Sequence, residues 1–535
     1  MNILRDSIVM LKVLFDKRPI LCLLAVNVLF MALVVVCLPF GFEPIDDRCL
    51  AWVTSGYLTG HPGYHTVYMH VFYAWIESRL YSLMPQIEWH TWLFLAIHLS
   101  SITVIGHCVL KSGNNGFVKS IALSLIYIME LYFLTHFQFT TTACLVATAG
   151  MLLVVLKHNY VLGIILFFIG TLIRYQAAMF CGLMTAALYP LVILVKGFDI
   201  RQITTLIVCV IGAVGLHFID IQMYSIDPRW KEMREADILR GKVYDNSNIW
   251  RVYSNPSEVI SQEDLDGMAC PFPYAPDCLW ENRSNIDGFW DNVLLNAFLQ
   301  KVEENTTYKG IQGLKKVKNI PVQLARYPFL FAVALLVVVG VLLSLDNKRQ
   351  RMALIMGTLC FPVILAYISL NVRLNERSLL CGWLPLVLLP LCVAPRFKRI
   401  SMFLSSIAIL LVGVFIVKSM PASKPYVEYS RQRELVDYGK ELGAKFIYSE
   451  NPFYPETEYP FGIRYHGLVK VYSDGNSGIC NNVNIEGDCV FLDEKGKKHQ
   501  GDIVPGFGLE ELKTNDNYVL YRLRKFDRPV IPFSD

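Results

Sequence analysis

Hydrophobic residues along the chain gather into runs of roughly 20, the length that an α-helix needs to cross the hydrocarbon core of a bilayer. Polar stretches separate the runs, and one run, 161–173, is shorter than the rest. About eleven helices are predicted to span a membrane: residues 19–40, 89–110, 117–134, 137–156, 161–173, 176–195, 204–223, 327–345, 352–370, 378–394 and 400–417. The pattern therefore predicts an α-helical polytopic membrane protein.

The positions of Lys and Arg between these runs predict an orientation. Basic residues occupy the N-terminal stretch and then every second loop, for example at Lys111 and Lys157. By the positive-inside rule these loops and the N-terminus are cytoplasmic. The first external loop is then 41–88, the large external loop is 224–326, and the tail 418–535 is extracytoplasmic.

Two domains follow from this division. Residues 1–417 form the transmembrane domain, and within its first external loop the aromatic-rich run 65–84 is expected to be an interfacial helix. Counting that run as a span would reverse every later loop and break the charge rule. Residues 418–535 combine a predicted helix at 429–442 with short strand-like runs between Gly, Asn and Asp turns. We expect a small α/β or α+β extracytoplasmic domain there.

Composition supports the same class. Of 535 residues, 54% are hydrophobic and 18% are charged, whereas soluble proteins have about 45–50% apolar and about 25% charged residues. The net charge of +4 is small, and the sequence has no basic patch with interleaved aromatics, so nucleic acid is not expected as a partner. The expected location is a cell membrane, inner or plasma, with membrane lipid as the surrounding partner.

The cysteines give an independent indication of compartment. Most of the 14 lie inside predicted spans, but Cys270 and Cys278 form one local pair, and Cys480 and Cys489 form another. Both pairs are predicted to be external, where an oxidising compartment favours disulfides. Neither pair has the spacing or the neighbouring His residues of a zinc site.

Charged residues next to a span are costly unless they have a task, so the external ends of the spans are where chemistry is expected. Asp46 and Asp47 follow the first span, Arg174 lies between two spans, and Arg373 and Arg377 lie between two others. A carboxylate can act as a base, and the planar fork of Arg binds phosphate oxygens. The alternatives are a solvated loop start for the acids and snorkelling anchors for the arginines.

A second group of residues is predicted to line a cavity or to contact an acceptor. It consists of His61, His65, Glu130, Asp220 and Arg240. The two histidines flank the turn HPGYH and could bind a divalent metal together with the aspartates, although a surface turn with incidental histidines is the simpler interpretation. Whether a metal takes part is left open.

The order of these features carries a family resemblance. A span is followed by an external loop with an acidic pair, the turn SGYLTGHPGYH and an aromatic run that ends in LYSLMP, and then by many spans and an extracytoplasmic tail. This order resembles polytopic glycosyltransferases of the GT-C superfamily, in particular uncharacterised bacterial members. The resemblance covers the membrane portion.

The resemblance implies an inverting transferase of the cell envelope. Such an enzyme would move a sugar from a polyprenyl-phosphate-linked donor to a glycan, lipid or protein acceptor on the extracytoplasmic face. Asp47, or else Asp46, would be the general base. Arg174, Arg373 and Arg377 would bind the donor phosphate.

Two other functions compete with this interpretation. A polysaccharide polymerase of the O-antigen type would use arginines of a large external loop, and this loop contains Arg229, Arg234, Arg240, Arg251 and Arg283. A lipid-linked glycan transporter or flippase would be expected to show repeated halves, which we do not detect in the sequence.

Overall fold

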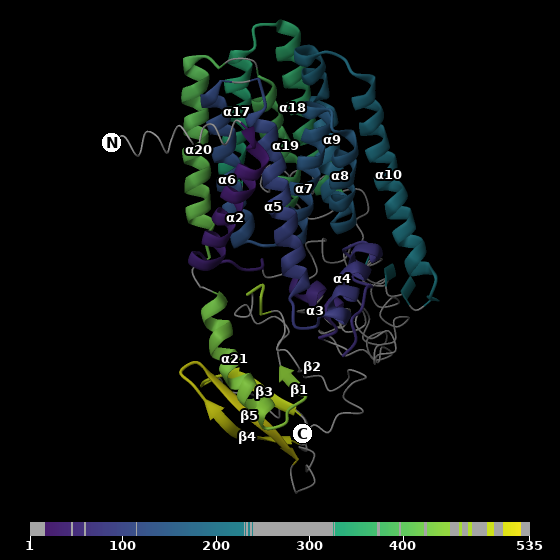
Figure 1. The fold of residues 1–535 in the computed structure, drawn as a ribbon, viewed down its shortest axis with the longest axis vertical. Coiled ribbons are helices and arrows are strands. Elements are labelled where there is room, and N and C mark those ends of the chain that lie inside the picture. The colour runs from purple at the N-terminus through teal and green to yellow at the C-terminus, as the bar shows by residue number, and fades with distance from the viewer. Residues whose placement is uncertain are drawn as a thin grey trace, which may run out of the picture.

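The computed structural model describes residues 17–43, 47–57, 60–113, 115–228, 230–231, 234–235, 238, 325, 327–371, 375–394, 397–421, 425–449, 459–462, 469–472, 489–496 and 507–525. Long helices form a bundle along one axis of the molecule (Figure 1). They are α2 (Pro19–Cys37), α5 (Trp89–Leu110), α6 (Gly116–Thr135), α7 (Phe139–Leu152), α8 (Tyr160–Ile173), α9 (Tyr175–Lys196), α10 (Ile200–Ser225), α17 (Pro328–Ser344), α18 (Lys348–Asn371), α19 (Glu376–Val393) and α20 (Arg399–Ser419).

Each predicted span coincides with one of these helices. Within the described ranges, nine helices are long and apolar enough to cross a membrane, and α8 and α17 are shorter apolar helices. One of the nine combines α7 with the π-helical turn η1 (Leu153–Lys157) that follows it. The prediction of a polytopic helical membrane protein is confirmed.

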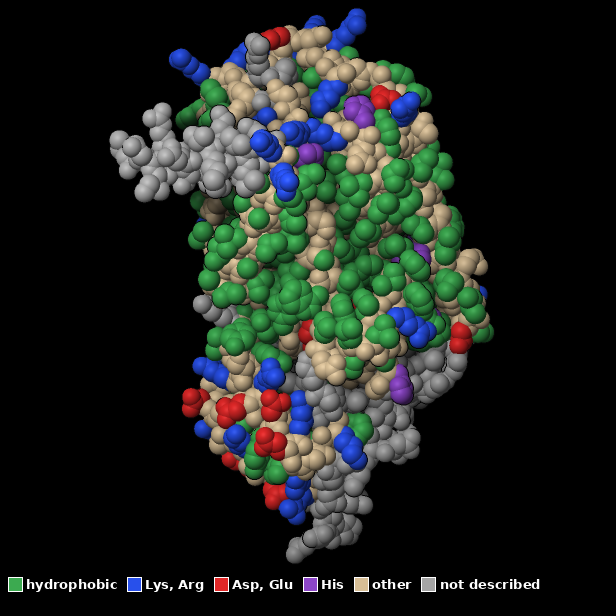
Figure 2. Space-filling view, viewed as in Figure 1, with side chains coloured by type: hydrophobic (Ala, Val, Ile, Leu, Met, Phe, Trp, Pro, Cys, Tyr) green, Lys and Arg blue, Asp and Glu red, His purple; other side chains and the backbone are tan. Residues whose placement is uncertain are grey.

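Two short helices, α3 (Asp47–Ser55) and α4 (Val71–Leu83), lie at one end of the bundle, the end that also faces the C-terminal sheet (Figure 1). We call this the α3–α4 end. Lys and Arg side chains crowd the opposite end, and a wide hydrophobic belt lies between the two (Figure 2). Helices α2, α10 and α20 each end toward the α3–α4 end (Figure 1).

The centre of the bundle is α7, which is buried along its whole length and is rich in small residues. Small residues let helix backbones approach closely inside a membrane. A Cβ at Gly150 would lie 2.6 Å from the carbonyl oxygen of Gly163, and a Cβ at Gly170 would lie 2.8 Å from that of Ala143. This close packing of α7 on α8 places the start of α7 beside the end of α8.

The C-terminal domain has one helix, α21 (Pro425–Glu441), and a five-stranded sheet of order β2-β1-β3-β5-β4. The strands are β1 (Phe446–Ser449), β2 (Val469–Tyr472), β3 (Cys489–Glu494), β4 (Phe507–Thr514) and β5 (Tyr518–Lys525). β1 runs parallel to β2 and β3, and β5 runs antiparallel to β3 and β4. Leu435 of α21 packs on Val490, Tyr518 and Leu520 of the sheet. The predicted small domain of helix and strand is confirmed.

A short segment of this domain, 459–462, packs against the bundle. The ring of Phe461 lies 5.2 Å from that of Trp92 and 5.8 Å from that of Phe40. The hydroxyl of Thr91 donates a hydrogen bond to the carbonyl of Pro460. The C-terminal domain therefore contacts the first turn of α5.

Candidate active site

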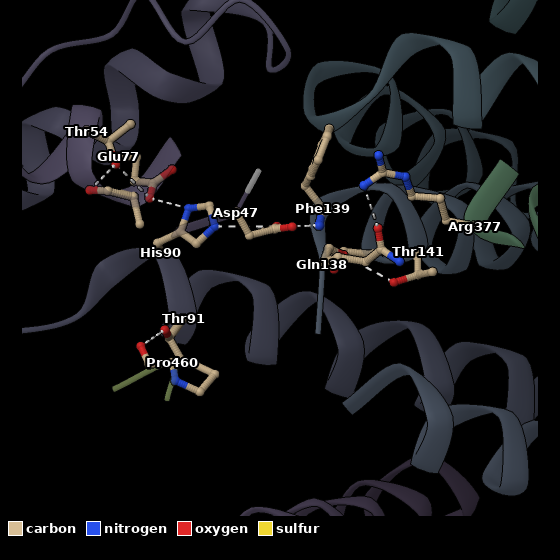
Figure 3. Close-up of polar contacts among 12 residues, drawn as sticks. Asp47, Thr54, Glu77, His90, Thr91, Gln138, Phe139, Thr141, Arg377 and Pro460 are labelled. Carbon is tan, nitrogen blue, oxygen red and sulfur yellow. Dashed lines mark hydrogen bonds and ion pairs between the residues drawn. The ribbon is translucent and has the colours of Figure 1, made fainter. Parts of the chain in front are cut away.

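The predicted base Asp47 lies at the start of α3 and meets the start of α7. Its side chain is 1% exposed, and its Oδ1 accepts a hydrogen bond from the backbone N–H of Phe139 at 2.6 Å (Figure 3). The first N–H groups of a helix have no partner within the helix and attract a carboxylate. The loop before α3 is fixed to the same place, because Phe42 and Phe137 form a β-bridge.

Arg174, between α8 and α9, reaches the same residue from another side. Its guanidinium lies 5.2 Å from the ring centroid of Phe139 and 5.1 Å from that of Tyr68. The two rings stack on each other with centroids 6.1 Å apart. A guanidinium above aromatic faces is held there by cation–π attraction. Asp47 and Arg174 thus both contact Phe139.

Arg377, in the first turn of α19, contacts the neighbouring residue Gln138. Its Nη1 lies 3.5 Å from Gln138 Oε1 (Figure 3). Gln138 is 1% exposed and its side-chain amide donates to Glu43. The hydroxyl of Tyr132 donates to Glu376 at 2.7 Å, which fixes the start of α19 against α6. Arg377 is therefore held beside the N-terminus of α7.

Three of the predicted residues thus converge on the pair Gln138 and Phe139, and they come from three separate parts of the chain. Their roles in binding and catalysis remain predictions. Three further candidates lie outside the described residues: Asp46, Arg373 and Arg240.

Sequence reasoning missed two buried residues beside Asp47. His90 Nε2 lies 3.8 Å from Asp47 Oδ1, and His90 Nδ1 lies 2.7 Å from Glu77 Oε1 (Figure 3). The hydroxyl of Thr54 also donates to Glu77 Oε1, at 3.1 Å. An available signal was that a Glu and a His within apolar runs need polar partners once they are buried.

Glu130 has a partner inside the bundle. Its Oε1 lies 2.9 Å from His98 Nδ1, and His98 Nε2 lies 2.9 Å from the hydroxyl of Thr142. That hydroxyl donates to the carbonyl of Gln138 at 2.7 Å. Glu130 is therefore connected to the start of α7 through His98 and Thr142, and it does not contact Asp47 directly.

Asp220 and His65 belong to a second cluster, at the end of α10. Asp220 accepts a hydrogen bond from the backbone of Val71 at 2.9 Å and pairs with Arg234 at 3.0 Å. The His65 ring stacks on Trp230 with centroids 4.0 Å apart. Burial lowers the pKa of His65 to about 4, although the charge of nearby Asp227 acts in the opposite direction. His61, by contrast, is exposed.

The second cluster also fixes the backbone that leads to Tyr68. Val67 has φ of +60°, a value that is unusual for a β-branched residue. Its N–H donates to the hydroxyl of Tyr224 at 2.7 Å. Because Val67 directly precedes Tyr68, the end of α10 helps to place the ring that lies against Arg174.

No group of three or more His, Cys, Asp or Glu side chains suited to a metal ion occurs in the described part of the chain. Cys489 is buried in β3. Cys270, Cys278 and Cys480 lie outside the described residues, so both disulfides stay predictions.

Comparison with known proteins gives one structural likeness. No protein-family model and no curated protein matches the sequence. The structure is similar to the crystal structure of ArnT from Cupriavidus metallidurans bound to undecaprenyl phosphate, with 12% sequence identity and a TM-score of 0.38. The likeness covers 94% of this chain and 97% of that chain. At this TM-score it is a distant likeness.

Proposed function

We propose that this protein is an integral membrane glycosyltransferase of the GT-C type. It transfers a sugar from a polyprenyl-phosphate-linked donor to an acceptor hydroxyl at the α3–α4 end of the bundle. Asp47 is the general base, and Arg174 and Arg377 bind the donor phosphate.

One observation carries this proposal, namely the convergence of a buried carboxylate and two guanidinium groups at the N-terminus of α7. The three side chains come from segments at one end of a bundle of apolar helices, and the phosphate of a lipid carrier is exposed at the end of such a bundle, where the hydrocarbon core stops. The N-terminus of a helix adds partial positive charge and free N–H groups, which also favour an anion.

The groups are suited to a single displacement. The acceptor oxygen forms a bond to the anomeric carbon while the bond from that carbon to the phosphate oxygen breaks, and the electron pair leaves on the phosphate. Asp47 takes the proton of the acceptor hydroxyl, which a positioned carboxylate does effectively. Arg174 and Arg377 stabilise the charge that develops on the leaving phosphate.

The proposal includes an orientation and a division of labour. The basic end of the bundle faces the cytoplasm with the N-terminus, and the α3–α4 end is extracytoplasmic. Residues 1–417 carry the chemistry. The domain 418–535 lies on the extracytoplasmic side, where a glycan, lipid or protein acceptor approaches.

The test is sugar transfer by purified protein in detergent or nanodiscs. The probes are polyprenyl-phosphate-linked hexoses, aminosugars and pentoses, and the product measured is released polyprenyl phosphate. Asp47→Asn should lower the rate on the order of 100-fold or more, because the general base is lost. Arg377→Ala should raise the donor KM on the order of tenfold, because a charge-assisted phosphate contact is lost.

A matched control is Asp199→Asn. Asp199 caps α10 at the basic end of the bundle and pairs with Tyr160, so this variant should transfer sugar normally. Full activity in Asp47→Asn, with release of polyprenyl phosphate from at least one donor, would refute the assignment of the base. Release of polyprenyl phosphate that needs neither Asp47 nor Arg377 would instead favour a polymerase, and movement of the intact donor across the membrane without release would favour a flippase.

A further inference from the structure

The proposed base is the first of three buried ionisable groups that lie in a row. His90 is between Asp47 and Glu77, and all three side chains are at most 1% exposed. The distances are 3.8 Å from His90 Nε2 to Asp47 Oδ1 and 2.7 Å from His90 Nδ1 to Glu77 Oε1. They come from α3, α4 and α5, so three elements must pack correctly to form the row (Figure 3).

The geometry indicates how the protons are distributed. Each ring nitrogen of His90 faces a carboxylate oxygen, and Thr54 already donates to the oxygen of Glu77 that meets the ring. A neutral imidazole has only one N–H, so it would turn a lone pair toward one of the two carboxylates. An imidazolium carries an N–H on both nitrogens: at 2.7 Å the Nδ1–H donates to Glu77, and at 3.8 Å the Nε2 side forms an ion pair with Asp47. Its charge balances buried negative charge, which is costly when it has no partner.

We propose that His90 and Glu77 form a positioning pair that keeps Asp47 ionised and correctly oriented while the acceptor binds. This inference rests on the proposed function. Glu77 holds the imidazolium, and the imidazolium places a positive charge next to Asp47. Asp47 then meets the acceptor hydroxyl as a carboxylate, ready to take its proton. His90 and Glu77 do not touch the substrate in this scheme.

Other titratable groups surround the pair. Burial and the charge of Glu77 raise the pKa of Tyr73 well above its usual value, so Tyr73 is neutral. Tyr81 donates to Glu88 at 3.5 Å, and its oxygen accepts the backbone N–H of His90 at 3.1 Å. Arg48, beside Asp47, lies over the ring of Trp52. Among the contacts described here, Glu77 is the carboxylate hydrogen-bonded to the imidazole ring.

Around Asp47 itself, the facing groups on α7 and the nearby helices are also charged or polar. The Phe139 N–H donates to it directly, Arg174 lies over the ring of Phe139, and Arg377 contacts Gln138. These groups stay in place when the positioning pair is altered. A change in the pH dependence of activity can therefore be assigned to the pair.

The decisive variant is Glu77→Gln, which keeps the shape of the side chain and removes its charge. Without Glu77 the imidazole loses its proton more easily, so Asp47 loses the neighbouring positive charge and binds a proton at higher pH. We expect the acid limb of the activity profile to move up by roughly one pH unit. The value of kcat at neutral pH should fall, and the donor KM should stay unchanged because both arginines remain.

The matched control is Glu88→Gln. Glu88 is a buried carboxylate that contacts Tyr81 instead of the imidazole. This variant should leave the position of the acid limb unchanged, even if it lowers thermal stability. An acid limb in Glu77→Gln that coincides with the wild-type limb would overturn the proposal, since a purely structural residue would change stability alone.

A double variant, His90→Asn with Glu77→Gln, covers the case in which Glu77→Gln does not fold. It removes the imidazolium and the Glu77 carboxylate together, so neither of them is left buried without the other. We expect the same upward movement of the acid limb, and a wild-type profile in the double variant would refute the inference. If Asp47→Asn retains full transfer, the proposed function fails. If Asp47→Asn is inactive but the acid limb does not move in these variants, only the positioning pair fails.

Discussion

The contact between α7 and α8 leads to a prediction about Gly170→Ala. Gly170 is one turn before Arg174, and its carbonyl accepts the N–H of Arg174 at 2.9 Å. A Cβ at Gly170 would lie 2.8 Å from the carbonyl oxygen of Ala143 and 3.1 Å from the Cβ of Ala147. Ordinary contact begins at 3.4 Å, so one added methyl group must push the end of α8 away from α7.

The size of the effect follows from these distances. The shortfall at Ala143 is the difference between 3.4 and 2.8 Å, that is about 0.6 Å. Overpacking of this kind costs about 1–3 kcal/mol, whereas replacing Gly by Ala inside a helix gains about 1 kcal/mol in propensity. Because a 1 Å misplacement of a substrate-positioning group can cost 100-fold in rate, we expect a loss on the order of tenfold in kcat/KM.

The control is Gly215→Ala on α10, where an added Cβ meets no atom within 4 Å. Both variants gain the same helix propensity, so the difference in unfolding free energy between them measures overpacking alone. Thermal unfolding in one detergent gives the stability, and titration with polyprenyl-phosphate donor gives kcat/KM. If Gly170→Ala matches Gly215→Ala in both measurements, the close packing of α7 and α8 does not set the position of Arg174.

Three more predictions test other parts of the structure. The pKa of His65 is about 4 in the folded protein against an ordinary 6.5, so protonation favours the unfolded state and stability should fall as the pH drops from about 6.5 toward 4. The difference between the thermal midpoints at pH 7 and pH 5 should be smaller in His65→Phe than in the wild-type protein. Tyr127 donates to the buried side chain of Asn27 at 2.6 Å, so Tyr127→Phe should lower the unfolding free energy by roughly 0.6–2 kcal/mol. An unchanged unfolding free energy would show that this hydrogen bond does not contribute to stability. Phe461→Ala removes the ring that packs on Trp92, so limited proteolysis between α20 and the sheet should become faster while the thermal midpoint of the bundle stays the same. An unchanged rate of proteolysis would contradict the attachment of the C-terminal domain through Phe461.

The spans could be predicted from sequence because hydrophobic length is a local property. The run 65–84 contains a helix, α4 (Val71–Leu83), and its place at the membrane interface stays a prediction. The strand β4 (Phe507–Thr514) is hard to recognise from sequence, because it reads FGLEELKT, which contains several helix-favouring residues. Its pairing with β5 (Tyr518–Lys525) overrides that local preference.

The candidate site was only partly predictable. Asp47, Arg174 and Arg377 could be chosen because charged groups at the ends of spans are unusual. Gln138 and Phe139 could not be chosen from the sequence, because their importance comes from where α7 begins relative to three other segments. His90 and Glu77 form a contact between two helices, and neither residue carries a local signal that names the other.

The length of α8 has a consequence for the depth of the site. With 14 residues, α8 spans only about 21 Å, whereas the hydrocarbon core of a typical bilayer is about 30 Å thick. A span this short creates a hydrophobic mismatch, which thinning of the bilayer beside Arg174 can relieve. The phosphate of the proposed donor can then reach Arg174 while its polyprenyl chain stays within the membrane. Under the proposed function, the thickness of the host bilayer becomes one of the determinants of how easily the donor enters.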